Sequence, residues 1–281
     1  MPVPMILFSD LDGTLLDHDT YSYEPVVPLL DHLKDLGIPV IFNTSKTRAE
    51  TQVLCNALDL KDPFIVENGS AVVIPSESPY RAHLSGLNDE NEFVLAEPRA
   101  HILKKLNTLR KKGFRFESYQ DWNVERLAKI TSLTREEARL SLQRHYTEPL
   151  IWRDSEEQLV LFKRLLEAQG LVALKGGRFL HVMSGGGKGE AMKWMVAQWQ
   201  RIHKARPIVV ALGDGGNDVC MLNEADYAVV IKSPVNPYPE VTTAGEVIQT
   251  GATGPEGWAR AVRLILQAHG WPMPLRDRLT N

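Results

Sequence analysis

Two aspartates, Asp10 and Asp12, follow an apolar run at residues 3–8 that has the composition of a buried strand. Side chains alternate between the two faces of a strand, so residues two apart point the same way. The two carboxylates should therefore emerge together at the carboxyl end of the strand, where open α/β sheets bind their ligands. They would repel each other unless a cation or a shared proton lay nearby. A magnesium ion together with a phosphoryl substrate would account for both.

If this pair acts on a phosphoryl group, the two carboxylates must have different roles. Phosphoryl transfer from an alkoxide requires a nucleophile and a proton donor. We predict that Asp10 is the nucleophile and forms an aspartyl phosphate. Asp12 would be the acid for the leaving oxygen and then the base for the attacking water. An isolated Asp-x-Asp pair could equally be a solvated turn or a helix N-cap, but the complete string DLDGT at 10–14 favours chemistry.

The segment Asn-Thr-Ser-Lys at 43–46 follows a second apolar run at 38–42. The hydroxyl of Thr44 or Ser45, with the backbone N–H groups at a helix start, could bind phosphate oxygens. Taken alone, the segment is more simply explained as the N-cap of the helix expected at 49–58.

A glycine-rich segment, Ser-Gly-Gly-Gly-Lys-Gly at 184–189, precedes another expected helix. It does not match GxxxxGK[ST], so it is not a nucleotide-binding P-loop. Lys188 could hold Asp10 and a phosphate by charge. The glycines could also form a hinge between domains, and the two roles are compatible.

Asp214 and Asp218 lie in the string GDGGND at 213–218, directly after an apolar run at 208–212. Acidic residues in a glycine-rich turn suit magnesium, which takes a few carboxylate oxygens and keeps several waters. An EF-hand calcium loop is excluded, because its ligand spacing and its bidentate glutamate are both missing. A plain surface turn stays open as an alternative.

The segments that carry these residues alternate strand and helix, which predicts right-handed βαβ units and a parallel sheet. The expected strands are at 3–8, 38–42, 64–66, 208–212 and 227–231, and the expected helices at 24–36, 49–58, 189–201 and 255–269. We therefore predict an α/β fold with a doubly wound, Rossmann-like parallel sheet.

Residues 82–183 have a different pattern, with short strands that pair most simply as antiparallel hairpins. The expected elements are helices at 98–112, from 134 and at 155–169, and strands at 114–119, 150–152, 171–174 and 178–182. The prediction is a core domain formed by 1–81 and 184–281, with an inserted α+β cap domain at 82–183.

The composition excludes several classes of partner. The chain has 281 residues, 43% of them hydrophobic, and a net charge of −3, so no basic excess points to nucleic acid or to an anionic membrane. No apolar run approaches the roughly 18 residues of a membrane span. Cys55 and Cys220 stand outside any CxxC motif, and we expect reduced thiols and a cytoplasmic protein. The oligomeric state is not determined by these features.

The order of the motifs is DxDGT, a Thr/Ser strand end, an inserted domain, a lysine and GDGxND. This order resembles the haloacid dehalogenase superfamily of phosphotransferases, in the branch whose cap lies between the second and third motifs. The resemblance covers both core segments and implies that Asp10 is the nucleophile and Asp12 the acid and base. It implies that Thr44, or Ser45, binds the phosphoryl group together with Lys188.

The same resemblance implies a Mg²⁺ cofactor. Its ligands would be the Asp10 carboxylate, the Asp12 backbone carbonyl and Asp214, and Asp218 would support that shell.

Five further strings resemble the family of mannosyl-3-phosphoglycerate phosphatases: TSKT at 44–47, ENG at 67–69, IWRDS at 151–155, GRFLHV at 177–182 and GPEGW at 254–258. This resemblance implies cleavage of a phosphate ester to give mannosylglycerate, a compatible solute. The substrate would be a small phosphorylated sugar that also carries a carboxylate.

Arginine pairs bidentately with carboxylates, so basic side chains in these strings are candidate substrate contacts. The basic candidates are Lys46, Arg153, Arg178 and His181, and Ser45 is a further candidate substrate contact. Each cap arginine could instead lie on a solvated surface. A glucosyl-3-phosphoglycerate, another sugar phosphate, or phosphomutase chemistry of the same superfamily stay open as alternatives.

Overall fold

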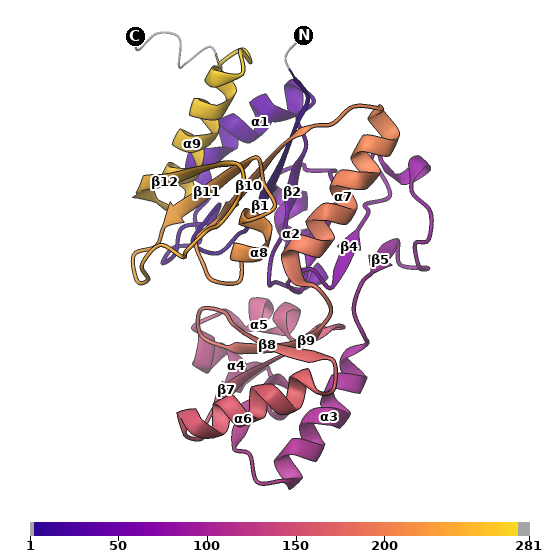
Figure 1. The fold of residues 1–281 in the computed structure, drawn as a ribbon, viewed down its shortest axis with the longest axis vertical. Helices are drawn as coiled ribbons and strands as arrows, with labels where there is room; N and C mark the ends of the chain where they lie inside the picture. Colours follow the sequence, from indigo (N-terminus) through magenta and orange to yellow (C-terminus); the bar gives the residue numbers. More distant parts are fainter. Residues whose placement is uncertain (1–2, 275–281) are drawn as a thin grey trace.

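The computed structural model describes residues 3–274, which form two lobes joined by two crossings of the chain (Figure 1). The expectations for residues 1–2 and 275–281 lie outside the described residues. Within the described part of the chain, no helix is both long and apolar enough to cross a membrane.

The larger lobe is built on a five-stranded parallel sheet with the order β12-β11-β10-β1-β2. Its strands are β1 (Met5–Ser9), β2 (Val40–Phe42), β10 (Ile208–Gly213), β11 (Tyr227–Lys232) and β12 (Glu246–Thr253). All five residues of β1 are buried, because this central strand is covered on both faces. The predicted α/β class and doubly wound parallel sheet are confirmed.

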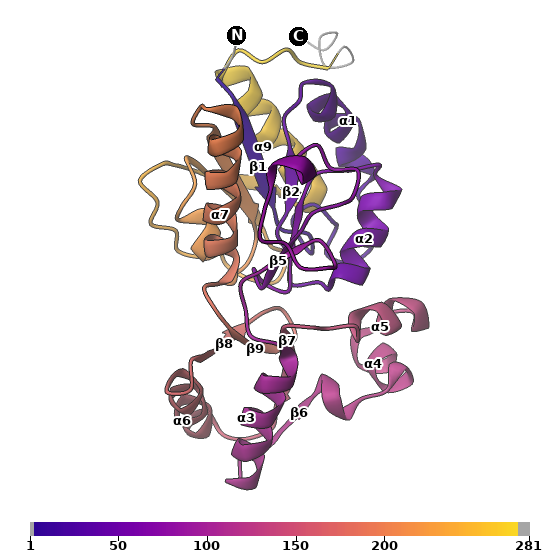
Figure 2. The same cartoon turned by 90° about the vertical axis from the view of Figure 1, so that its right-hand side faces the viewer.

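Helices cover both faces of this sheet (Figure 2). On one face, Met5 and Leu7 pack with residues of α1, α2 and α9, and on the other Ile6 and Phe8 pack with residues of α7 and α8. The helices are α1 (Val27–Asp35), preceded by the short η1 (Glu24–Val26), α2 (Arg48–Ala57), α7 (Gly187–His203), α8 (Val219–Leu222) and α9 (Gly254–Ala268).

The edge strand β12 was not predicted from the sequence. Its residues pair in parallel with β11, yet only Thr250 among its eight residues is buried. Most side chains of an edge strand such as β12 are at least partly exposed to solvent, so the strand needs no continuous apolar run. The apolar run that identified β1 and β10 is therefore absent from β12.

A small antiparallel sheet with the order β3-β4-β5 lies beside the core sheet. Its strands are β3 (Phe64–Val66), β4 (Ala71–Val73) and β5 (Glu92–Val94), and the short η2 (Arg81–His83) precedes β5. The predicted insert at 82–183 thus includes β5, which pairs with β4 of the core lobe. Because this pairing ties residues 92–94 to the core, we propose that the cap begins near Pro98.

The smaller lobe contains an antiparallel sheet with the order β6-β7-β9-β8. Its strands are β6 (Phe116–Ser118), β7 (Thr147–Trp152), β8 (Leu171–Lys175) and β9 (Leu180–Ser184). Its helices are α3 (Arg99–Lys111), η3 (Tyr119–Asp121), α4 (Val124–Thr131), α5 (Arg135–Ser141) and α6 (Glu156–Glu167). Side chains of α3 and α6 pack on one face of the sheet. This α+β cap with antiparallel pairing is the second part of the predicted fold class, and it is confirmed.

Asp62 lies just before β3, away from the strand ends that carry the motifs, and its burial affects the stability of the fold. Its Oδ2 accepts a hydrogen bond of 3.1 Å from the Val40 N–H, and burial raises its pKa from 3.8 to about 6. A carboxyl whose folded pKa is raised loses stability as the pH rises through the interval between the two values. Asp62→Asn keeps the acceptor without the charge, so we expect a gain on the order of 1–3 kcal/mol in unfolding free energy at pH 7.

The gain of Asp62→Asn should shrink towards zero near pH 3, below both pKa values, where the carboxyl of Asp62 is largely protonated in the folded and in the unfolded state. Urea unfolding at the two pH values measures it. An equal effect at both would contradict the assignment.

Candidate active site

The carboxyl ends of β1 and β10 bring the two predicted aspartate motifs together. The strands are adjacent and parallel, with Ser9 opposite Leu212, and the Asp10 N–H donates to the Leu212 carbonyl at 2.9 Å. Asp10 and Asp214 therefore emerge side by side. The carboxyl ends of β1 and β10, which carry them, point toward the smaller lobe (Figure 1). Parallel pairing brings this about because both strands end in the same direction.

Lys188 joins the aspartates from the first turn of α7. Its side chain is fully buried, and its Nζ lies 2.5 Å from Asp10 Oδ1 and 2.6 Å from Asp218 Oδ1. Burial disfavours the ammonium charge, but the carboxylates of Asp10 and Asp218 outweigh it and raise the pKa of Lys188. The lysine is therefore held as a cation between two carboxylates.

The start of α7 is fixed by two other strand ends. Asn43, after β2, donates from Nδ2 to the Lys188 carbonyl at 3.0 Å. The turn after β3 packs directly against the first residue of α7. A Cβ on Gly69 would lie 2.2 Å from the Gly187 carbonyl oxygen, and the φ of Gly69 is +91°. Only glycine fits such a close approach in the left-handed region. Asn43 was in the predicted phosphate segment, but its positioning role was missed.

Asp10, Asp214 and Asp218 form an acidic cluster whose ligand oxygens lie within 4.8 Å of one another. Burial, followed by the charge of Asp218, raises the pKa of Asp10 well above its usual value and that of Asp214 to about 7. Hard carboxylate oxygens crowded together in this way suit a divalent cation such as Mg²⁺. The residues present therefore fit the metal that the sequence predicted.

Asp218 is engaged by the protein on both oxygens. Oδ1 accepts from Lys188, while Oδ2 accepts from the N–H groups of Asp214 and Gly215 at 3.1 and 3.0 Å. These bonds fold the GDGGND loop back on itself and aim Asp214. Both oxygens of Asp218 thus accept hydrogen bonds from the protein, and its supporting role in a metal site stays a prediction.

Asp12 is paired with the predicted phosphate segment. Lys46 Nζ lies 2.8 Å from Asp12 Oδ1. Burial opposes the charge of Lys46, but Asp12 and Glu50 outweigh it and raise its pKa. The predicted acid and base residue thus lies against the segment that follows β2.

The residues 43–46 do not cap α2, which removes the simpler explanation of that segment. Thr47 is the N-cap, and with Glu50 it forms a reciprocal capping box. Thr44 is fully buried, and its Oγ1 accepts from the Lys46 N–H at 3.1 Å. The hydroxyls of Thr44 and Ser45 are thus not used to cap the helix.

The three predicted cap contacts have different surroundings. His181 on β9 is buried. Its neighbours Leu180 and Val182 pack against α3 and α6, so by strand alternation the His181 side chain lies on the opposite face of the sheet. Its Nδ1 is buried and has no hydrogen-bond partner among residues 3–274. Burial, followed by the positive charges of Arg144 and Lys188, lowers the pKa of His181 to about 3. His181 is therefore a neutral imidazole within electrostatic range of Arg144 and Lys188.

Arg178 and Arg153 are held by groups of the cap itself. Arg178 donates to the Thr131 carbonyl, and Arg153 Nε lies 3.1 Å from Glu117 Oε1. Neither has a contact with the acidic cluster within the described part of the chain. Their role as substrate contacts stays a prediction.

Glu67 and Arg144 join cap and core, and sequence reasoning assigned no role to either. The buried Glu67 carboxylate accepts from the N–H groups of residues 145–147, at 2.8, 3.2 and 2.8 Å. Arg144 donates from Nη1 to the Ser45 carbonyl at 3.1 Å. In the sequence, Glu67 was singled out only as part of the ENG string at 67–69, and no motif included Arg144.

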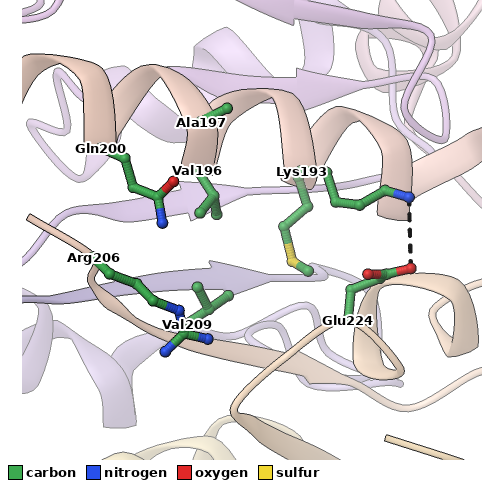
Figure 3. A pocket seen from close by; sticks show the side chains of 8 residues that line it. Lys193, Val196, Ala197, Gln200, Arg206, Val209 and Glu224 are labelled. Atoms are coloured by element: carbon green, nitrogen blue, oxygen red, sulfur yellow. Dashed lines mark ion pairs between the residues drawn. The ribbon is translucent and has the colours of Figure 1, made fainter. Parts of the chain in front are cut away.

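A cavity of about 160 Å³ lies elsewhere, between α7 and the start of β10 (Figure 3). Lys193 and Glu224 form an ion pair of 3.6 Å beside it, and Arg206 lines its other end. None of its lining residues belongs to the acidic cluster. It is therefore separate from the candidate active site.

Comparison with known proteins agrees with this geometry. A family model described as haloacid dehalogenase-like hydrolase matches residues 7–237. Similar solved structures include a phosphatase of the haloalkanoate enzyme superfamily from Bacteroides thetaiotaomicron, with 20% identity, coverage of 95% of this chain and 96% of that one, and a TM-score of 0.64. Another is the sucrose-phosphatase of Synechocystis sp. PCC6803 in complex with sucrose and phosphate, with 13% identity, coverage of 96% and 100%, and a TM-score of 0.58.

At these identities the solved structures establish the fold alone. The family match covers the whole insert and parts of both core segments, residues 7–81 and 184–237, and it includes the DLDGT string, Lys188 and the GDGGND string. The chain belongs to the haloacid dehalogenase-like hydrolase family.

Proposed function

We propose that this protein is a magnesium-dependent phosphatase that hydrolyses mannosyl-3-phosphoglycerate to mannosylglycerate and phosphate through an aspartyl-phosphate intermediate. One observation carries the proposal. The buried Lys188 ammonium bridges Asp10 and Asp218, with Asp214 alongside, so residues from separate loops meet at one acidic centre. A buried cluster of this kind is costly to fold and has a use where charge develops during a reaction.

The proposed reaction begins with Asp10. Its carboxylate attacks phosphorus, the ester P–O bond breaks, and Asp12 gives a proton to the leaving alkoxide. Asp12 then takes a proton from water, the water oxygen bonds to phosphorus, and the aspartyl P–O bond breaks to release phosphate and restore Asp10. The atoms balance as ester plus water giving alcohol plus phosphate.

The surrounding residues support these steps. Lys188 neutralises charge at Asp10, and Thr44 with Lys46 offers donors for the phosphoryl oxygens. Asp10, the Asp12 carbonyl and Asp214 would hold Mg²⁺. When bound, the ion would neutralise charge on the phosphoryl oxygens.

The mannosyl substrate is proposed from the strings IWRDS and GRFLHV in the cap and from the buried His181 Nδ1, which has no hydrogen-bond partner among the described residues. The neighbour named sucrose-phosphatase is compatible with a phosphorylated sugar as substrate. We also propose a cytoplasmic location, which suits the two free cysteines, Cys55 and Cys220.

A substrate panel with phosphate detection tests the proposal. The panel contains mannosyl-3-phosphoglycerate, glucosyl-3-phosphoglycerate, sucrose 6-phosphate and mannose 6-phosphate. We expect the first to be hydrolysed with the highest kcat/KM. If the glucosyl compound is hydrolysed fastest, the proposed substrate is wrong and the glucosyl compound takes its place. An isomerised sugar phosphate without free phosphate would indicate a mutase. No reaction with any of these esters would contradict the proposed phosphatase activity.

Removal of the metal gives a further prediction. Because the carboxylates of Asp10 and Asp214 need a cation to coexist as anions near a phosphate, chelation with EDTA should abolish phosphate release. Excess Mg²⁺ should restore it, whereas Ca²⁺, which prefers more ligands at longer distances, should not. Full activity in EDTA would contradict the metal requirement.

A further inference from the structure

Arg144 carries a buried guanidinium from the cap into the interface with the core. It lies between α5 and β7, and only 4% of its side chain is exposed. Nη1 donates to the Ser45 carbonyl at 3.1 Å and to Thr147 Oγ1 at 2.9 Å. Ser45 stands between Thr44 and Lys46, the proposed phosphoryl contacts, so Arg144 lies against the phosphate segment.

One edge of this guanidinium has no protein acceptor. Nε is buried and has no hydrogen-bond partner in the described chain, and both hydrogen bonds that Arg144 makes there leave from Nη1. A buried donor without a partner costs about 1–3 kcal/mol, and native proteins seldom leave one without a purpose. The free Nε–Nη2 edge is the side-on fork with which arginine binds a carboxylate through two parallel bonds.

The nearest carboxylate does not satisfy this edge. Glu67 Oε2 lies 4.0 Å from Arg144 Nη1, on the side that is already engaged. The same oxygen accepts from the Thr147 N–H at 2.8 Å and from Thr147 Oγ1 at 2.7 Å. Glu67 thus balances part of the charge of Arg144 without occupying the fork.

His181, close to Arg144 in the cap sheet, has a second buried nitrogen without a partner among the described residues. Its strand β9 pairs with β7, with His181 opposite Pro149, and β7 begins three residues after Arg144. The unpartnered nitrogen of His181 is Nδ1. Lys188 contacts the proposed nucleophile. Arg144 and His181 thus belong to the cap, and Arg144 contacts the segment that follows β2, whereas Lys188 contacts Asp10 within the core.

We propose that Arg144 and His181 bind a carboxylate of the substrate and so select phosphomonoesters that carry a second acid group. This inference rests on the proposed phosphatase function. Among the cap arginines considered, Arg153 is paired with Glu117 and Arg178 with the Thr131 carbonyl, so Arg144 has the free edge. The phosphoryl group is left to Lys188 and Thr44 in the core.

Two three-carbon esters test this assignment, 3-phosphoglycerate and glycerol 3-phosphate, which differ in a carboxylate against a hydroxymethyl group. We expect the wild-type enzyme to prefer 3-phosphoglycerate. Arg144→Gln should lower kcat/KM for 3-phosphoglycerate about 100-fold, the effect of losing a charged hydrogen-bond pair. The value for glycerol 3-phosphate should fall less than about threefold, and Arg144→Lys should recover part of the preference.

Arg139→Gln is the matched control, because Arg139 lies on α5 of the cap but is exposed and paired with Glu136; it should leave the preference unchanged. If thermal melting shows that Arg144→Gln does not fold, His181→Leu tests the same site and should lose the preference. Equal losses on both esters, or a wild-type enzyme without the preference, would overturn the inference. Failure of the proposed function is distinct, since the wild-type enzyme would then not release phosphate even from p-nitrophenyl phosphate.

Discussion

Asp10→Asn should lower kcat by about 10⁴-fold or more, because the substitution removes the oxygen nucleophile on which both half-reactions depend. The fold should be unchanged. The introduced asparagine would fill the same volume, and its amide oxygen can still accept the hydrogen bond that Lys188 now donates at 2.5 Å. Burial and the neighbouring charge of Asp218 already disfavour the ionised form of Asp10 and raise its pKa. Loss of the charge is therefore tolerated.

The measurement is phosphate release together with acid quenching of enzyme mixed with radiolabelled substrate. Wild-type protein should retain acid-stable label at an aspartyl residue, and the Asp10→Asn protein should retain none. Asp19→Asn is a suitable control, because Asp19 is exposed in the same segment of the chain. A rate within tenfold of wild type, or equal labelling of the two proteins, would contradict the covalent mechanism.

Lys188→Met should have the largest effect on stability. The methionine would leave Asp10 and Asp218 buried without the cation that now lies 2.5 and 2.6 Å from them. Breaking a buried ion pair by removing one partner typically costs about 3–5 kcal/mol, and we expect that loss in urea unfolding at pH 7 without Mg²⁺. Phosphate release should fall at least about 10³-fold, since the charge that faces the phosphoryl group is lost.

The pH dependence of this loss has a definite sign. Without the lysine, burial and mutual repulsion raise the pKa of Asp10 further, so the folded state favours the protonated acid. The destabilisation should therefore be smaller at pH 5 than at pH 8. An effect that is independent of pH would indicate lost packing alone.

A second substitution separates charge from packing. Asp218→Asn combined with Lys188→Met removes one of the two uncompensated carboxylates, and we expect it to recover at least about 1 kcal/mol. Lys193→Met on the same helix is the matched control. Lys193 is about half exposed and pairs with Glu190 and Glu224, so its loss should cost less than about 1 kcal/mol. No recovery in the double variant would contradict a charge-based role.

The sequence by itself identified the residues that the structure brings to one edge of the core sheet. A continuous apolar run at 3–8 is typical of a central parallel strand, and two carboxylates directly after it must lie at its carboxyl end. The same reasoning applied to the strand before Asp214. Because parallel strands end on one side, both motifs were expected at that edge of the sheet, and the resemblance to the haloacid dehalogenase superfamily implied that Asp10 and Asp214 meet there. The specific substrate stays a prediction, since the strings that suggest it lie in the cap.

Contacts between side chains of distant segments became visible only in the tertiary structure, because no local sequence pattern relates those segments. The second partner of Lys188, the coupling of Lys46 to Asp12, and the contact of Arg144 with Ser45 each join side chains from different elements. The same holds for β12 and β5, whose short or exposed strands have no strong periodicity of their own. Local sequence encodes which face of a strand or helix is apolar. Which charged atoms become neighbours depends on how those elements pack, and that information is spread over the whole chain.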